Sequence, residues 1–186
     1  MEGNKTFRAY HGSRQKFNNF NYSYIGSHAL ENGFGIYFTT DPNIAQTYGD
    51  YVLEADITMH GLFSIDSITI TKEQVKEYIR KYVDPTGEDY LSNYGWYVDE
   101  GYDNVLNKCV DMIFSYNQSD NDILSEIFLE IQNKYTDEAF DAIYKIFKKD
   151  GIIYTGYSDF DGEEITNYIV YSNKQVTNKN WIPIKE

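Results

Sequence analysis

Apolar and polar positions divide this chain into three blocks, and the first is rich in β-strand patterns. From residue 6 to residue 66, short apolar runs alternate with turns rich in glycine and asparagine. Strands are predicted for the runs FRAYHG (7–12), GIYFT (35–39), YVLEADIT (51–58) and LFSID (62–66). The segment DPNIAQTYG (41–49) predicts a short helix capped by Asp41, with Pro42 in its first turn and Gly49 at its end.

The second block changes to helical spacing. After Thr71, a suitable N-cap, the apolar residues Val75, Tyr78, Ile79 and Val83 lie on one face of a helix. The same spacing recurs in YDNVLNKCVDMIFSY (102–116), DILSEIFLEIQNKY (122–135) and TDEAFDAIYKIFKK (136–149). We therefore predict a helical insertion at 71–149. It forms either a subdomain or a set of helices packed on the same sheet, and the second arrangement is the more economical.

The third block, residues 151–184, returns to β-strand patterns. The runs GIIYTGYS (151–158) and ITNYIVYS (165–172) predict two strands joined by the acidic loop DFDGEE (159–164). Both faces of the second run are largely apolar, which indicates a central, buried strand. Asn167 is then a polar side chain in an apolar row, and it requires hydrogen-bond partners.

Composition favours one globular domain over residues 1–186. Apolar residues make up 41% of the 186 residues and aromatic residues 17%. No apolar run approaches the ~18 residues that span a bilayer, and the N-terminal segment lacks the apolar stretch of a signal peptide. We expect no membrane partner and a cytoplasmic location, either in the producing cell or in a target cell. Cys109, the single cysteine, lies among apolar residues at helical spacing and is expected to be a buried thiol.

The charge argues against nucleic-acid partners. Sixteen basic and 29 acidic residues give a net charge of −13, and no run of Lys or Arg suggests a local basic groove. His28 and His60 lack metal-ligand spacing with any Cys or carboxylate pair, so we predict no metal site.

Candidate chemistry begins with GFGIYFTTDPNIAQTYG (33–49). Gly33 and Gly35 permit close approach of a flat ligand, and Tyr37 and Tyr48 are eleven residues apart on a strand and the helix after it. Their rings form either the walls of a slot for a planar heterocycle or ordinary packing between the two elements.

The turn His11-Gly12-Ser13 is the second candidate. An imidazole suits a ribose hydroxyl, and the backbone N–H and C=O of Gly12 suit a carboxamide. The alternative is a core histidine beside an ordinary turn. Arg8 and Arg14 flank His11, where they either meet a pyrophosphate or serve as surface charges.

Taken in order, YHGS, GFGIYFT, an aromatic residue eleven positions after Tyr37, and NYIVYSNKQV resemble the diphtheria-toxin-like, His-Tyr-Glu branch of the ADP-ribosyltransferases. That branch includes the poly(ADP-ribose) polymerase catalytic domains and small transferases of bacteria and phages. The matching motifs lie in the two β-rich blocks. The resemblance implies an α+β fold: a split pair of antiparallel sheets flanked by helices, with a cleft for NAD between the halves.

The resemblance also implies residue roles. His11 would bond the adenosine ribose of NAD, the Gly12 backbone would hold the nicotinamide carboxamide, and Tyr37 and Tyr48 would sandwich the nicotinamide ring. The implied cofactor-binding set is completed by Ser13, Gly35 and Phe38.

Two positions depart from the family pattern. Asn167 stands where the family has a glutamate, and losing such a carboxylate costs on the order of 10²–10³ in rate. Glu163 and Glu164 are candidate substitutes, unless DGEE is a solvated turn. Ala45 stands where the family often has a hydroxyl, for which Thr47 or Ser13 are candidate replacements.

The expected function is mono-ADP-ribosylation of a protein acceptor by NAD, in a toxin-like effector of bacterial or phage origin. Chain elongation is not expected without the glutamate. One alternative is a catalytically lapsed relative that binds NAD or an ADP-ribose-containing ligand without turnover. A further alternative is an acidic interaction protein whose tyrosines are core residues.

Overall fold

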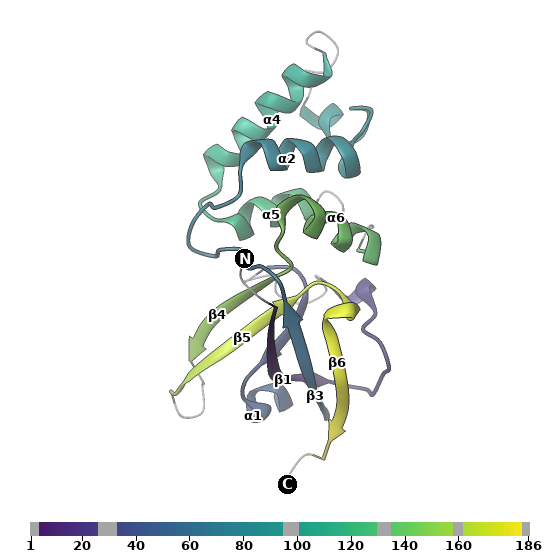
Figure 1. Cartoon of the computed structure of the whole chain (residues 1–186), viewed down its shortest axis with the longest axis vertical. Coiled ribbons are helices and arrows are strands. Elements are labelled where there is room, and N and C mark those ends of the chain that lie inside the picture. The colour runs from purple at the N-terminus through teal and green to yellow at the C-terminus, as the bar shows by residue number, and fades with distance from the viewer. Residues whose placement is uncertain (1–3, 26–32, 95–100, 130–134, 158–161, 184–186) are drawn as a thin grey trace. The chain divides into compact units, whose positions relative to one another are not determined.

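The chain folds into two compact units in the computed structural model, which describes residues 4–25, 33–94, 101–129, 135–157 and 162–183. The sheet unit comprises residues 1–62 and 149–186, and the helical unit comprises residues 63–148. The insertion expected at 71–149 thus corresponds to the helical unit, which is a compact body in its own right (Figure 1).

Six strands form one antiparallel sheet in the order β4-β5-β2-β1-β3-β6, which confirms an α+β fold. The strands are β1 (Lys5–Ser13), β2 (Ile36–Thr39), β3 (Tyr51–Met59), β4 (Gly151–Tyr157), β5 (Glu164–Val170) and β6 (Val176–Ile182). Five of them lie where the apolar runs predicted strands. The sixth, β6, was not predicted as a separate element, because this edge strand has a mostly polar middle, TNKN, that shows no alternation.

The sheet is nearly divided in two. β1 pairs with β3 along its whole length, from Lys5↔Met59 to Ser13↔Tyr51. Its pairing with β2 consists of Tyr10↔Thr39 alone. Two half-sheets, β1-β3-β6 and β4-β5-β2, therefore meet at a single register pair. Figure 1 shows β4 and β5 running in a different direction from β1, β3 and β6.

Both half-sheets line one apolar cluster, here called the sheet core. Its members alternate along the strands with outward-facing residues, as expected for strands with one buried face. The buried members are Ala9, Ile36, Phe38, Ala55, Ile57, Met59, Tyr168, Val170 and Val176, and Phe7, Phe20, Tyr22, Leu62 and Ile153 pack against them.

The helix α1 (Pro42–Gln46) forms close to where it was predicted. The Asp41 carboxylate accepts a hydrogen bond from the Asn43 N–H at 2.7 Å, which confirms the cap. The helix ends at Gln46, three residues before the predicted end at Gly49.

The prediction of a strand at residues 62–66 is wrong. Leu62 makes one isolated bridge to Gly151, and the following residues form no strand. The backbone of Ser64 instead bonds the start of α5: its N–H donates to Asp120 Oδ2 at 3.1 Å, and its C=O accepts from Asn121 N–H at 3.1 Å. Backbone groups satisfied in this way are not available for a sheet ladder.

The helical unit contains α2 (Lys72–Tyr78), which continues into a π-helical turn at Ile79–Val83, α4 (Tyr102–Tyr116), α5 (Asp120–Leu129) and α6 (Asp137–Phe147). Thr71 and Gln74 form the predicted cap of α2 as a capping box. Cys109 is fully buried, as predicted. The part of the predicted helix 122–135 beyond α5 lies largely outside the described residues, as does His28. Among the described helices, none has the length and apolar character needed to cross a bilayer.

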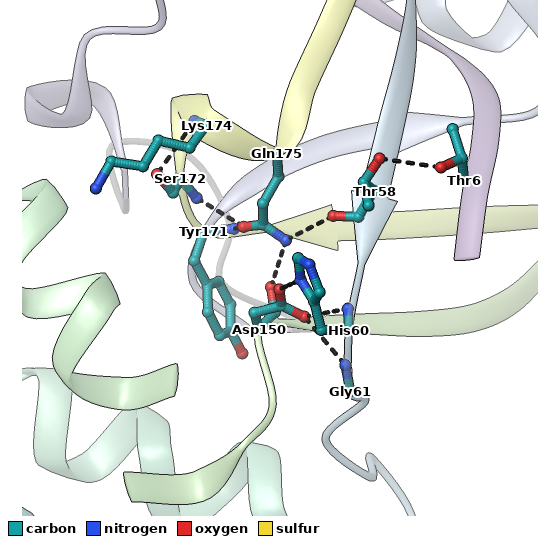
Figure 2. A network of polar contacts seen from close by, with 9 residues as sticks. All are labelled: Thr6, Thr58, His60, Gly61, Asp150, Tyr171, Ser172, Lys174 and Gln175. Carbon is teal, nitrogen blue, oxygen red and sulfur yellow. Dashed lines mark hydrogen bonds and ion pairs between the residues drawn. The ribbon is translucent and has the colours of Figure 1, made fainter. Parts of the chain in front are cut away.

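A buried amide ties the two half-sheets together. Gln175 is 6% exposed, and its side-chain oxygen accepts hydrogen bonds from the N–H groups of Tyr171 and Ser172, each at 2.9 Å. Its side-chain nitrogen donates to the C=O of Thr58 in β3 at 3.2 Å and to that of Asp150 at 2.9 Å (Figure 2). The Gln175 amide thus connects β3 with the residues that follow β5 and precede β4.

The Asp150 carboxylate extends the same network. Its Oδ1 accepts from the N–H groups of His60 at 2.9 Å and Gly61 at 3.2 Å, and its Oδ2 accepts from His60 Nδ1 at 2.6 Å (Figure 2). The end of β3 is therefore fastened to the start of β4, beside the bridge between Leu62 and Gly151.

We expect Gln175→Ala to lower the free energy of unfolding by about 2–3 kcal/mol, because the change leaves buried donors and acceptors without partners. Urea denaturation of the full chain measures this loss. Gln118→Ala, at an exposed position, is the matched control and should change the free energy by less than about 0.5 kcal/mol. Equal effects of the two substitutions would contradict the role given to Gln175.

Candidate functional site

The motifs YHGS and GIYF meet where the two half-sheets part. Pairing of β1 with β2 ends at Tyr10↔Thr39, while β1 keeps its β3 partners through Gly12↔Val52 and Ser13↔Tyr51. From His11 onward, β1 therefore has no register pair with β2. We call this place the sheet opening.

The His11 side chain bridges the sheet opening. Its Nδ1 lies 2.8 Å from the backbone C=O oxygen of Tyr37. A carbonyl oxygen only accepts hydrogen bonds, so Nδ1 carries the proton. Burial lowers the pKa of His11 and outweighs the opposite effect of the bond to Tyr37. The imidazole is accordingly neutral at pH 7, with the lone pair on Nε2 able to accept a hydrogen bond from a hydroxyl.

Aromatic rings surround the imidazole. The ring centroids of Phe20, Phe38 and Phe17 lie 4.8, 5.6 and 6.1 Å from that of His11. Phe38, which the resemblance placed in the cofactor-binding set, is 2% exposed and belongs to the sheet core. These contacts supply the burial that keeps His11 neutral.

Gly12 allows α1 to approach β1. A Cβ atom at this position would lie 1.7 Å from the C=O oxygen of Ala45 and 3.0 Å from Tyr48 Cβ. Ala45, which stands where the family often has a hydroxyl, is 1% exposed and packs against Gly12. The structure thus brings Gly12 and Tyr48 together.

The two candidate replacement hydroxyls are engaged locally. Ser13 Oγ donates to the C=O of Gln15 at 2.8 Å, and Thr47 Oγ1 donates to the C=O of Ile44 at 2.7 Å. The Ser13 bond stabilises the turn after β1, and the Thr47 bond caps the C-terminal end of α1.

Tyr37 and Tyr48 lie on the sheet face that is opposite to the sheet core. Directly paired residues share a face, so Tyr10 and Thr39 point the same way, and Tyr37 joins them by strand alternation. Gly12 is two residues from Tyr10 and therefore shares its face, and a Cβ atom on it would point toward Tyr48. The Tyr37 hydroxyl donates to the C=O of Gly33, whereas Tyr48 is 71% exposed.

Gly35 serves the packing of β2 on β5. Its φ of 144° favours glycine, and a Cβ atom would lie 2.5 Å from Ile169 Cγ2. The side of Gly35 that was expected to receive a flat ligand is therefore filled by Ile169.

Asn167 lies in a central strand, as predicted. It pairs with Thr39 on β2 and with Tyr154 on β4, and its side-chain nitrogen would lie 3.0 Å from a Cβ atom added to Gly156. Since Tyr37 is two residues from Thr39, Tyr37 and Asn167 share one sheet face. The structure therefore places these two predicted site residues on one face of two neighbouring strands.

Glu163 and Glu164, the candidates to replace the family's glutamate, do not lie beside Asn167 on its face of the sheet. Glu164 is the exposed first residue of β5, where it pairs with Tyr157. It is three residues from Asn167, so its side chain points to the opposite face of the strand. Glu163 is exposed and precedes the strand. Glu164 is consequently not a direct substitute for the missing glutamate.

A carboxylate that the sequence pattern did not indicate, Glu54, lies on the same face of the sheet as Asn167. Tyr10 pairs with Glu54, and the Tyr10 hydroxyl donates to Glu54 at 3.4 Å. Arg8 also bonds Glu54, at 3.1 Å, and Asp56, at 2.5 Å, on the face away from His11. Only the strand register reveals this arrangement, because nothing in the local pattern shows which strands pair.

Comparisons of the chain with protein-family models, curated protein sequences and solved structures found no match. The proposal below therefore depends on the motifs and on the geometry just described.

We expect His11 to titrate below the range of an ordinary histidine, whose pKa is 6.5. Below about pH 6.5 the unfolded chain takes up a proton that folded His11 does not bind, so stability should fall as the pH falls. Nitrogen-15 NMR of the ring should show a proton on Nδ1 and none on Nε2 at pH 7. In His11→Gln this pH dependence should weaken, and titration of His11 at or above pH 6.5 would refute the assignment.

Proposed function

We propose that this protein is a mono-ADP-ribosyltransferase that cleaves NAD at the nicotinamide–ribose bond and transfers ADP-ribose to a protein acceptor. One observation carries the proposal: the imidazole of His11 reaches the backbone of Tyr37, 26 positions away, across the sheet opening. These residues belong to two of the motifs that carry the resemblance.

The fold gives independent support. Within the one six-stranded sheet, two half-sheets share a single register pair, and this supports the split sheet that the resemblance implies. The proposed NAD site is the sheet opening. His11 lies on the sheet-core side of β1, whereas Tyr37, Tyr48 and Asn167 lie on the other side, so a ligand that contacts all four would have to reach both faces of the sheet.

The chemistry follows from these positions. Neutral His11 would accept a hydrogen bond from the adenosine ribose, and the Gly12 backbone would bond the carboxamide. The tyrosine rings would hold nicotinamide while its bond to the ribose breaks and nicotinamide leaves with the bonding electrons. The acceptor's nucleophile would then attack the cationic ribose carbon and lose its proton. Asn167 would bond a ribose hydroxyl without supplying a negative charge.

A second candidate function is binding of NAD, or of an ADP-ribose-containing ligand, without turnover. The observation that favours it is the combination of a neutral amide at Asn167 with Glu164 on the opposite face of β5. Under this alternative His11, Tyr37 and Tyr48 keep their binding roles and the chemical step is lost.

We expect the purified protein to release nicotinamide from labelled NAD in the presence of a cell lysate and to label a lysate protein. Tyr48→Ala should raise KM for NAD by about tenfold, since one stacking ring is removed. Tyr116→Ala is the matched control, because Tyr116 is also highly exposed (77%) but belongs to the helical unit. Release without lysate would indicate an NAD glycohydrolase. NAD binding that requires His11 without any release would establish the binding alternative.

A carboxylate at position 167 should increase the rate. We expect Asn167→Glu to raise the rate of nicotinamide release by about 10²-fold, because a negative charge beside the ribose stabilises the developing cation. Glu164→Gln should leave the rate unchanged, since Glu164 points to the other face of β5. A folded Asn167→Glu protein that still binds NAD but shows no increase would contradict the proposed position of the ribose.

A further inference from the structure

Aromatic side chains continue from His11 across the half-sheet β1-β3-β6. His11 pairs with Leu53, and Leu53 pairs with Trp181, so Trp181 projects on the same face as His11. Tyr51 is two residues from Leu53 and shares this face. The Trp181 centroid lies 5.1 Å from that of Phe17 and 6.3 Å from that of Tyr51. We call Phe17, Tyr51 and Trp181 the aromatic patch.

The aromatic patch is partly exposed to solvent, whereas the sheet core is buried. Tyr51 is 39% exposed, and Phe17 and Trp181 are partly exposed, whereas Leu53 between them is fully buried. Phe17 contacts both His11 and Trp181. The patch therefore begins at the imidazole and extends away from the sheet opening along the end of the half-sheet.

Basic residues occur in the segments that carry these rings, although the whole chain carries −13. Residues 13–20, 50–53 and 179–182 contain three cations and one carboxylate: Arg14, Lys16, Lys179 and Asp50. Lys16 Nζ lies 5.3 Å from the centroid of the Tyr51 ring, a cation–π distance. Lys179 donates to the C=O of Asn18 and to Asn19 Oδ1, so it holds the segment that carries Lys16.

We propose that the aromatic patch and Lys16 bind the adenine and the diphosphate of NAD. This inference rests on the proposed function and extends it to residues of β3 and β6 that lie outside the motifs of the resemblance. Exposed rings stack on purines, and a lysine ammonium beside them attracts phosphate. With adenine on the patch, His11 would stand between the two ends of NAD, beside a ribose.

The inference predicts selectivity for the adenine end of the ligand. The test uses the full chain carrying Trp96→Phe, which leaves Trp181 as the only tryptophan. ADP-ribose and ADP should quench its fluorescence with saturation, and nicotinamide mononucleotide, which lacks adenine, should not. By calorimetry, Tyr51→Ala should weaken ADP-ribose binding about tenfold. Lys16→Ala should weaken the binding of ADP more than the binding of adenosine. It should also reduce the dependence of ADP binding on salt concentration.

The outcomes separate this inference from the proposed function. If ADP-ribose binds and depends on Tyr51 and Lys16 but NAD is never cleaved, the patch stands and the transferase proposal fails. If transfer occurs while Tyr51→Ala and Lys16→Ala leave KM for NAD equal to that of the Tyr116→Ala control, the patch assignment is overturned. Equal quenching by ADP-ribose and nicotinamide mononucleotide would also overturn it.

Discussion

The single register pair between Tyr10 and Thr39 determines how the sheet unit is built. A continuous ladder between β1 and β2 would engage the backbone of His11 and Gly12, and no ligand could reach it. Because the ladder stops there, the half-sheets must be held by other means. The sheet core supplies apolar contact, and the Gln175 amide with the Asp150 carboxylate supplies directional bonds at the start of β4. The sheet opening and the polar network are thus two consequences of one constraint.

His11 shows how the opening is tolerated energetically. Its Nδ1–H donates a hydrogen bond to the C=O of Tyr37 in β2, beside the part of β1 that has no register pair with β2. The side chain thus replaces a backbone hydrogen bond of the sheet. The surrounding phenylalanines bury the imidazole and keep it neutral, which avoids a buried charge without a partner. The same features that stabilise an open sheet therefore leave one imidazole nitrogen as a hydrogen-bond acceptor.

Local patterns in the sequence predicted most elements, since caps such as Asp41 and Thr71 and alternation in β1, β3 and β5 act over a few residues. Distant partners could not be predicted in this way. LFSID has a strand-like pattern, yet the carboxylate of Asp120, far along the chain, takes the Ser64 N–H. Likewise, the hydrogen bond between His60 and Asp150 joins two residues that are separated in the sequence by the whole helical unit. The resemblance supplied the candidate site residues, but only the register showed that Glu164 and Asn167 face opposite ways.

The surroundings of Asn167 explain why an amide fits this position. Thr39 beside it is 5% exposed, and Ile169 and Ile165 continue the row on the same strand. A carboxylate there would lose hydration, and burial would raise its pKa. An amide carries no charge and avoids that cost. A glutamate introduced at this position would act only in its ionised form. Any gain in rate should therefore grow as the pH rises through the pKa of that carboxyl, whereas a purely structural effect of the substitution would not depend on pH in this way.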